Sequence, residues 1–186
     1  MIEVEIRSFL TDEEYSKLLN FFKKNGNFLD EDFQITVYFS GDNDLRVQKT
    51  KNYSKLWLKT GKIHDVYREE IEVLFKREDF EKLVRILKIL GFNAEIVWLR
   101  KRLKFEWDGI KVYLDDTKGY GKIIELELHT EKEERNSKEI LLKRLKELGI
   151  NLTPRETFEK KFLWYKKNWR HLIKESLKRF DIESVI

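Results

Sequence analysis

Apolar and charged residues alternate strictly over several short stretches of the chain. The first, residues 2–7, reads IEVEIR. A two-residue period is that of a β-strand with one apolar face and one polar face. Alternating or β-rich runs of this kind, separated by turn residues or helical stretches, predict eight strands, at residues 2–7, 33–39, 45–48, 56–59, 67–75, 94–107, 110–114 and 122–130.

A helical period appears between these strands. It predicts helices at residues 11–24, 79–90, 137–148 and 154–180. Thr11 and Glu14 have the spacing of a capping box at the start of the first helix. Asp108 and Gly109, between two alternating runs, predict a tight hairpin. Without an internal boundary or repeat, the elements predict one α+β domain over residues 1–186, with a C-terminal helical segment at about 154–186.

One face of strand after strand is charged. The groups that share a face are Glu3, Glu5 and Arg7; Arg68, Glu70 and Glu72; Arg100, Arg102 and Lys104; and Glu125, Glu127 and His129, extended by Arg46 with Gln48, Trp57 with Lys59, and Lys111 with Tyr113 and Asp115. Two structures fit this pattern. The charged face of an antiparallel sheet can meet water, or it can line an eight-stranded closed barrel whose helices pack outside.

The sorting of charge favours the closed barrel, or tunnel. Acidic pairs lie on the first and last strands, and basic residues lie mostly between them. A solvated face would gain only about 0–1 kcal/mol per ion pair from such sorting. A site for a metal and a polyphosphate uses both signs, because carboxylates bind hard cations and basic groups bind phosphate oxygens.

Composition excludes several other classes. Charged residues make up 39% of the chain, but 38 basic residues stand against 34 acidic ones, so the chain is not a uniformly basic coat for nucleic acid. Cysteine is absent and only three histidines occur, which argues against a zinc site. No apolar run is long enough to span a bilayer and no signal-peptide pattern is present, so we expect a cytoplasmic protein.

Six short motifs occur in an order that resembles the CYTH proteins, also called triphosphate tunnel metalloenzymes. They are EVEIR at residues 3–7, LR at 45–46, KTG at 59–61, REEIE at 68–72, RKR at 100–102 and LDDTKGYGKIIELE at 114–127. The resemblance covers roughly residues 1–165. It implies an eight-stranded antiparallel tunnel that binds a triphosphate through Mg²⁺ or Mn²⁺. Arg7 stands where the family usually has lysine, and Gln48 stands where a second arginine is common.

The resemblance also implies roles for individual side chains. The expected metal ligands are Glu3, Glu5, Asp115, Glu125 and Glu127, of which Glu5, Asp115 and Glu127 are the expected catalytic residues. The expected phosphate-binding residues are Arg7, Arg46, Lys59, Arg68, Arg100 and Arg102, with Glu70 and Glu72 in support. Trp57 and Tyr113 could stack on a base or simply pack.

Three functions remain open from the sequence. The first is a metal-dependent hydrolase of inorganic triphosphate that also accepts nucleoside triphosphates, and we favour it because no nucleotide-specific motif is readable. The second is a class IV adenylate cyclase, and the third is a non-catalytic module that binds polyphosphate or RNA. We expect a monomer or homodimer with a small-molecule ligand and no membrane partner. The aromatic, basic tail is expected to pack on the strands instead of binding nucleic acid.

Overall fold

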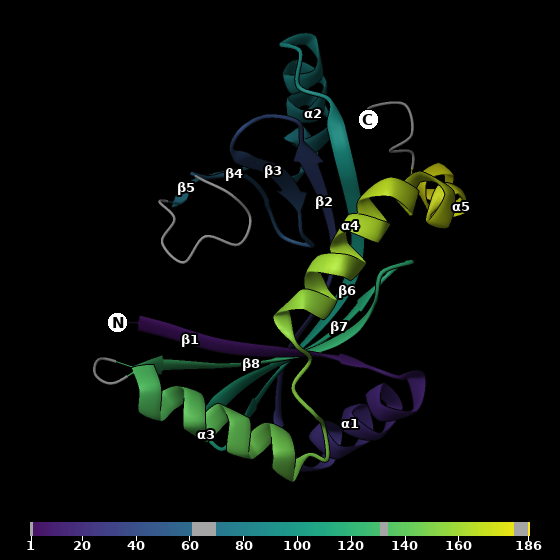
Figure 1. Ribbon diagram of the computed structural model, residues 1–186. Coiled ribbons are helices and arrows are strands. Elements are labelled where there is room, and N and C mark those ends of the chain that lie inside the picture. The colour runs from purple at the N-terminus through teal and green to yellow at the C-terminus, as the bar shows by residue number, and fades with distance from the viewer. Residues whose placement is uncertain (1, 61–69, 131–133, 181–185) are drawn as a thin grey trace. The chain divides into compact units, whose positions relative to one another are not determined.

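The computed structural model describes residues 2–60, 70–130, 134–180 and 186 (Figure 1). Its strands are β1 (Ile2–Leu10), β2 (Asn27–Phe39), β3 (Asp44–Lys49), β4 (Ser54–Lys59), β5 (Glu70–Phe75), β6 (Ala94–Trp107), β7 (Ile110–Thr117) and β8 (Gly121–Thr130). Its helices are α1 (Asp12–Asn25), α2 (Phe80–Ile89), α3 (Glu134–Glu147), α4 (Arg155–Leu172) and α5 (Lys174–Arg179), with a short 3-10 helix, η1 (Arg77–Asp79), before α2. Each predicted strand and helix has a counterpart.

The strands form one antiparallel sheet in the order β1-β8-β7-β6-β2-β3-β4-β5. The α+β class and the eight antiparallel strands are therefore confirmed. Among the described residues, no hydrogen bonds close this sheet into a barrel. In the described part of the chain the order begins at β1 and ends at β5, and closure would need these two strands to pair with each other.

The chain divides into two compact units. Unit 1 comprises Met1–Asp32 and Lys101–Leu163, and unit 2 comprises Phe33–Arg100 and Trp164–Ile186. Strands β2 and β6 and helix α4 each contribute residues to both units. The single domain of the sequence analysis stays a prediction, and each unit is described by itself below.

The core of unit 1 is the apolar face of β1, β8 and β7. Ile6, Leu126 and Val112 lie on that face, and α1 and α3 pack against β1 and β8 (Figure 1). Helix α1 begins with the predicted capping box, because the Thr11 side chain accepts from the Glu14 backbone and Glu14 accepts from the Thr11 backbone. With this face filled, most charged residues of β1, β7 and β8 occupy the opposite face, and the exceptions, Asp116 and Lys122, lie at the strand ends, where Lys122 pairs with Asp12 of α1.

Unit 2 has its own core, in which Val37, Val47 and Val84 are fully buried. Helix α2 packs on the side of β3 that carries Val47, and the Lys49 ammonium reaches Glu81 of the helix at 2.6 Å. Strands β3 and β4 pair along their whole length, with Asp44 opposite Lys59 at one end and Lys49 opposite Ser54 at the other. Apart from Lys49, the charged side chains of both strands (Asp44, Arg46, Lys55 and Lys59) therefore lie on the face away from α2.

Two predicted elements differ in extent. Strand β2 begins at Asn27 instead of residue 33, because its first half also has partners on β6: Phe28 packs against Phe105, and Lys101 reaches Glu31 at 2.8 Å. The predicted tail helix is broken at Ile173, whose φ of −116° and ψ of 13° leave the helical region. Residues 67–69 of the fifth predicted strand lie outside the described residues.

The second half of α4 packs on β6 within unit 2, as predicted for its aromatics. The Tyr165 hydroxyl donates to the Val97 carbonyl at 2.9 Å, and the Trp169 indole donates to the Glu95 carbonyl at 2.6 Å. Tyr165 is fully buried. Among the described residues, no helix combines the length and the apolar character that crossing a membrane would need.

Replacing Tyr165 with phenylalanine should lower the free energy of unfolding by about 1 kcal/mol or somewhat more, because it removes one buried hydrogen bond and leaves the Val97 carbonyl unsatisfied. Urea unfolding followed by circular dichroism measures this loss. Tyr53→Phe is the matched control, since Tyr53 is 40% exposed. A loss below about 0.3 kcal/mol would show that the bond does not hold α4 in place.

Candidate functional site

The charged face of unit 1 spans three neighbouring strands. Glu5 on β1 lies directly opposite Glu127 on β8, which in turn lies opposite Lys111 on β7. Side chains at directly opposite positions of an antiparallel pair lie on the same face, with Cβ atoms about 4.5–5.5 Å apart. The predicted alternation is therefore confirmed for Glu5, Glu125 and Glu127, and the register brings the three carboxylates onto one surface.

Glu127 has the densest surroundings on this face. Lys111 Nζ donates to its Oε1 at 3.0 Å, and His129 Nε2 lies 2.6 Å from the same oxygen. Lys111 and His129 also contact each other. Burial would raise the pKa of Glu127, but the hydrogen bond and charge of Lys111, with a further hydrogen bond from Tyr113, hold that pKa below its ordinary value.

Arg102 and Asp115 form a forked ion pair in unit 1. Arg102 Nε and Nη2 donate to the two oxygens of Asp115, each at 2.7 Å, and Nη2 also lies 3.4 Å from Glu125 Oε1. Burial would lower the pKa of Arg102, yet the bonds to Asp115 raise it overall, so this guanidinium stays charged. Asp115 is only 3% exposed, and both its oxygens already accept hydrogen bonds.

The other predicted residues of β1 lie at the edge of this surface. Arg7 lies opposite Glu125, approaches Glu5 at 3.7 Å and extends over the ring of Phe158 on α4. Glu3 lies opposite His129 in the register, and its side chain is not among those described. Unit 1 thus brings together Glu5, Arg7, Arg102, Asp115, Glu125 and Glu127 of the predicted set.

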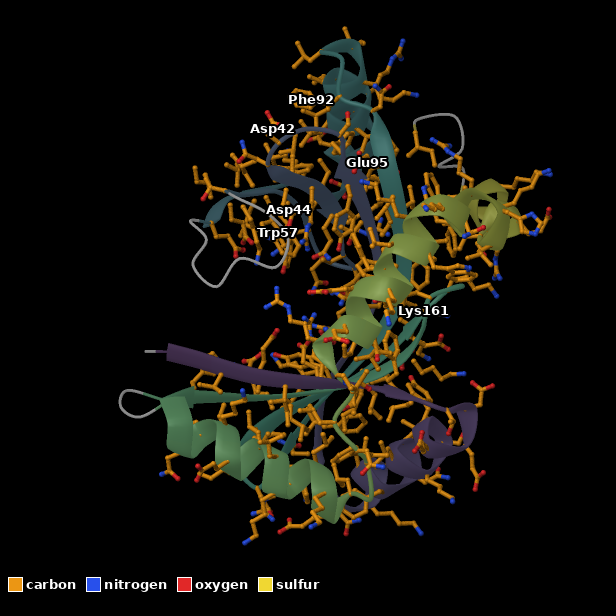
Figure 2. All side chains as sticks on the ribbon, in the orientation of Figure 1. Asp42, Asp44, Trp57, Phe92, Glu95 and Lys161 are labelled. Atoms are coloured by element: carbon orange, nitrogen blue, oxygen red, sulfur yellow. The ribbon has the colours of Figure 1, made fainter. Side chains whose placement is uncertain are left out.

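Unit 2 carries a second charged face, centred on Trp57. Arg46 lies opposite Tyr38 on one side and opposite Trp57 on the other. Its Nε and Nη2 donate to both oxygens of Asp44, at 2.6 and 2.5 Å, and its guanidinium lies over both rings, 4.3 Å from the Tyr38 centroid and 4.7 Å from that of Trp57. Figure 2 labels Asp44 and Trp57, which lie near each other on β3 and β4.

The remaining basic residues of this face also have acidic or amide partners. Lys59 reaches Glu70 at 2.7 Å, and Lys55 reaches Glu72 at 2.5 Å. The predicted supporting residues Glu70 and Glu72 therefore hold lysines of β4 in this structure. Arg100 donates twice to Gln34 Oε1. Arg68 lies outside the described residues.

Gln48 is buried at a position where the family that the sequence resembles commonly has an arginine. Its amide nitrogen donates to the Thr36 hydroxyl at 2.9 Å, and the two residues are 5% and 6% exposed. Lys55 lies opposite Gln48 on β4. The position is thus neutral and satisfied internally, which leaves Lys55 as the basic residue at this level of the face.

Comparisons with known proteins identify the family. The model of the CYTH domain matches residues 1–158. The chain belongs to the CYTH domain family. A protein of Methanocaldococcus jannaschii named "Putative adenylate cyclase MJ0240" is 33% identical to the CYTH chain over 177 residues, which are 88% of this chain and 97% of that protein.

Solved structures support the assignment. The CYTH chain is similar to the PH1819 protein of Pyrococcus horikoshii OT3, with a TM-score of 0.66 and 26% identity over 87% of this chain and 98% of that one. It is also similar to a conserved hypothetical protein of Pyrococcus furiosus, with a TM-score of 0.65 and 28% identity over 83% and 96% of the two chains. Enzymes of the CYTH family act on triphosphates with a divalent metal ion.

The carboxylates of unit 1 suit such a metal ion in part. Glu5 and Glu127 are like charges at directly opposite positions, an arrangement that destabilises a strand pair unless a cation lies near both. Asp115 suits a metal less well, because Arg102 occupies both its oxygens. Across the described residues no group of three or more acidic or histidine side chains is gathered as a metal site would be. The ligand set therefore stays a prediction.

Four residues of these faces received no role in the sequence analysis. Alternation alone places Lys111 and His129 beside Glu127, but only the register shows that both contact it. Lys55 and Asp44 each lie one residue before the predicted start of their strand, at residues 56 and 45. Extending each predicted strand by one residue would have placed both on the charged face.

Proposed function

We propose that this CYTH protein is a metal-dependent hydrolase of inorganic triphosphate that also accepts nucleoside triphosphates. Family membership supports an enzyme that acts on a triphosphate. The choice of hydrolysis rests on how the aromatic rings of the charged faces are used. Tyr38 and Trp57 in unit 2 hold Arg46, and Tyr113 in unit 1 holds Arg102 at 4.4 Å. These rings position cations, and a base would have to displace those cations to stack there.

We assign the acidic residues to the metal ion and the basic residues to the phosphate oxygens. Glu5, Glu125 and Glu127 would hold Mg²⁺ or Mn²⁺ through oxygen ligands. When bound, the metal ion neutralises phosphoryl oxygens and makes a bound water more acidic. In unit 1 the candidate phosphate ligands are Arg7 and Arg102. In unit 2, taken by itself, they are Arg46, Lys59 and Arg100, with Arg68 as a further candidate from the sequence. Asp115 orients Arg102 through its forked bond.

Cyclisation of ATP is the second candidate. Its support is the printed name of the M. jannaschii relative, which is 33% identical to this chain. A cyclase must hold the adenine and activate the ribose 3′-hydroxyl, so it needs a base site in addition to phosphate ligands. A non-catalytic module that binds polyphosphate is the third, and it requires only the cations.

One assay separates these functions. The protein is incubated with Mn²⁺ or Mg²⁺ and either inorganic triphosphate or ATP, and released phosphate and cyclic AMP are measured. We expect phosphate from inorganic triphosphate at a kcat/KM at least about tenfold above that for ATP, because none of the contacts above recognises adenine. Cyclic AMP as the main product from ATP would overturn the proposal. Triphosphate binding without turnover of either substrate would favour the non-catalytic module.

A further inference from the structure

Trp57 occupies the centre of the charged face of unit 2. Lys55, Trp57 and Lys59 alternate along β4, so all three side chains lie on the same side of the strand. The Lys55 ammonium lies 4.1 Å from the centre of the indole and the Lys59 ammonium 5.2 Å. With Arg46 at 4.7 Å, three cations surround one aromatic ring.

The indole attracts these cations without using their hydrogen bonds. The negative face of an aromatic ring binds a cation electrostatically and offers no lone pair to its N–H donors. The carboxylates of Asp44, Glu70 and Glu72 do use some of those donors. The lysine ends are flexible, however, and can turn from a carboxylate to another anion while they stay close to the ring.

The edge of the same ring carries an unused donor. Trp57 Nε1 is buried from solvent, and among the residues that the structure describes it has no hydrogen-bond partner. An indole nitrogen can only donate, and a buried donor without an acceptor is unfavourable. The ends of Lys55 and Lys59 lie 4.1 and 5.2 Å from the ring centre, so an anion that they attract is drawn to the surroundings of this donor.

We propose that Trp57 binds the substrate directly, by donating its Nε1–H to a phosphoryl oxygen of the triphosphate that Arg46, Lys55 and Lys59 attract. The inference rests on the proposed function in taking a triphosphate as the ligand. It assigns Trp57 to phosphate recognition instead of base stacking, because three cations already contact the ring. It also adds Lys55 to the residues that bind phosphate.

Binding and turnover are measured separately to test this. Inorganic triphosphate is titrated calorimetrically into wild type, Trp57→Phe and Trp164→Phe, first with a chelator and then with Mn²⁺. Trp57→Phe keeps an aromatic ring and removes the N–H, and we expect at least about tenfold weaker binding, since a hydrogen bond to a charged group contributes that much. Trp164→Phe removes an indole N–H from an α4 residue that is 44% exposed, and it should bind like wild type.

The indole NMR signal of Trp57 tests direct contact with triphosphate, because a purely structural role of Trp57 would leave its chemical shift unchanged on binding. The chain has five tryptophans, so spectra of protein labelled with ¹⁵N-tryptophan contain five indole signals, and the Trp57 signal is assigned by its loss in Trp57→Phe. Triphosphate should shift the Trp57 indole proton downfield more than any other. An unmoved Trp57 signal at saturation, or binding within twofold of wild type in Trp57→Phe, would overturn the inference.

The two proposals can fail independently. Wild type that binds triphosphate through Trp57 but releases no phosphate would remove the hydrolase and leave this inference standing. Hydrolysis with an unperturbed Trp57 signal would overturn the role of Trp57 and leave the hydrolase standing. Wild type that does not bind inorganic triphosphate at all would overturn the assignment of Trp57.

Discussion

Replacing Glu5 with glutamine should lower kcat/KM for inorganic triphosphate at least 100-fold, which corresponds to about 2.7 kcal/mol of lost transition-state stabilisation. The amide keeps the size of the side chain but removes the negative charge that faces Glu127 across β1 and β8. A divalent ion is bound mainly by charged oxygen ligands, so its affinity should fall with the charge. Phosphate release is measured over a range of Mn²⁺ concentrations, and excess metal should restore only part of the activity.

The fold of this variant should remain intact. Glu5 and Glu127 are like charges at opposite positions, so removing one of them relieves repulsion when metal is absent. Thermal unfolding in a chelator should therefore give a melting temperature equal to or above that of wild type. Glu13→Gln on α1 is the control, because its side chain is 77% exposed and pairs only with Lys17 in the ion pairs described. Wild-type turnover in Glu5→Gln would remove Glu5 from the metal ligands.

Local sequence signals predicted the faces of the strands and the hairpin between β6 and β7. Strict alternation put Glu125 and Glu127 on the side of β8 away from Ile124 and Leu126, as the structure has them. The Asp108–Gly109 turn has both residues at positive φ, as a two-residue hairpin requires. Counting back from that turn sets Arg102 opposite Asp115, which agrees with their forked ion pair.

Long-range features could not be derived in the same way. Closure of the barrel depends on whether β1 and β5 pair, and nothing in the local pattern of either strand determines this. The partner of a charged side chain depends on register: Lys55 reaches Glu72 because β4 and β5 pair as they do. Alternation predicts which residues lie on the charged face. It does not predict whether a carboxylate on that face binds a metal ion or pairs with a neighbouring guanidinium.

For Arg46, the alternatives are binding of phosphate and a structural ion pair with Asp44. It was predicted to bind phosphate, yet the structure ties its Nε and Nη2 to Asp44 and leaves Nη1 outside that fork. The side chains of Arg46 and Asp44 are 14% and 2% exposed. Burial would lower the pKa of Arg46, but the nearby Tyr38 and the bonds to Asp44 raise it overall, so the pair is ionised.

Replacing Arg46 with methionine should lower the free energy of unfolding by about 3 kcal/mol or more, because the Asp44 carboxylate then stays buried without its forked partner. Urea unfolding measures this loss. Stability alone cannot separate a structural role from phosphate binding, since an unstable protein also binds poorly. The double variant Asp44→Asn with Arg46→Met separates them, because replacing both members of a buried pair is often close to neutral. We expect it to recover to within about 1 kcal/mol of wild type.

Triphosphate binding by the double variant then decides the role of Arg46. If Nη1 contacts phosphate, the recovered fold should still bind inorganic triphosphate at least about tenfold more weakly, as loss of a charged hydrogen bond predicts. If Arg46 only braces β3 against Tyr38 and Trp57, binding should recover together with stability. In that case phosphate recognition in unit 2 would fall to Lys55, Lys59, Arg100 and the Trp57 indole. Equal affinity of wild type and the double variant would thus withdraw Arg46, and Arg46 alone, from the phosphate ligands.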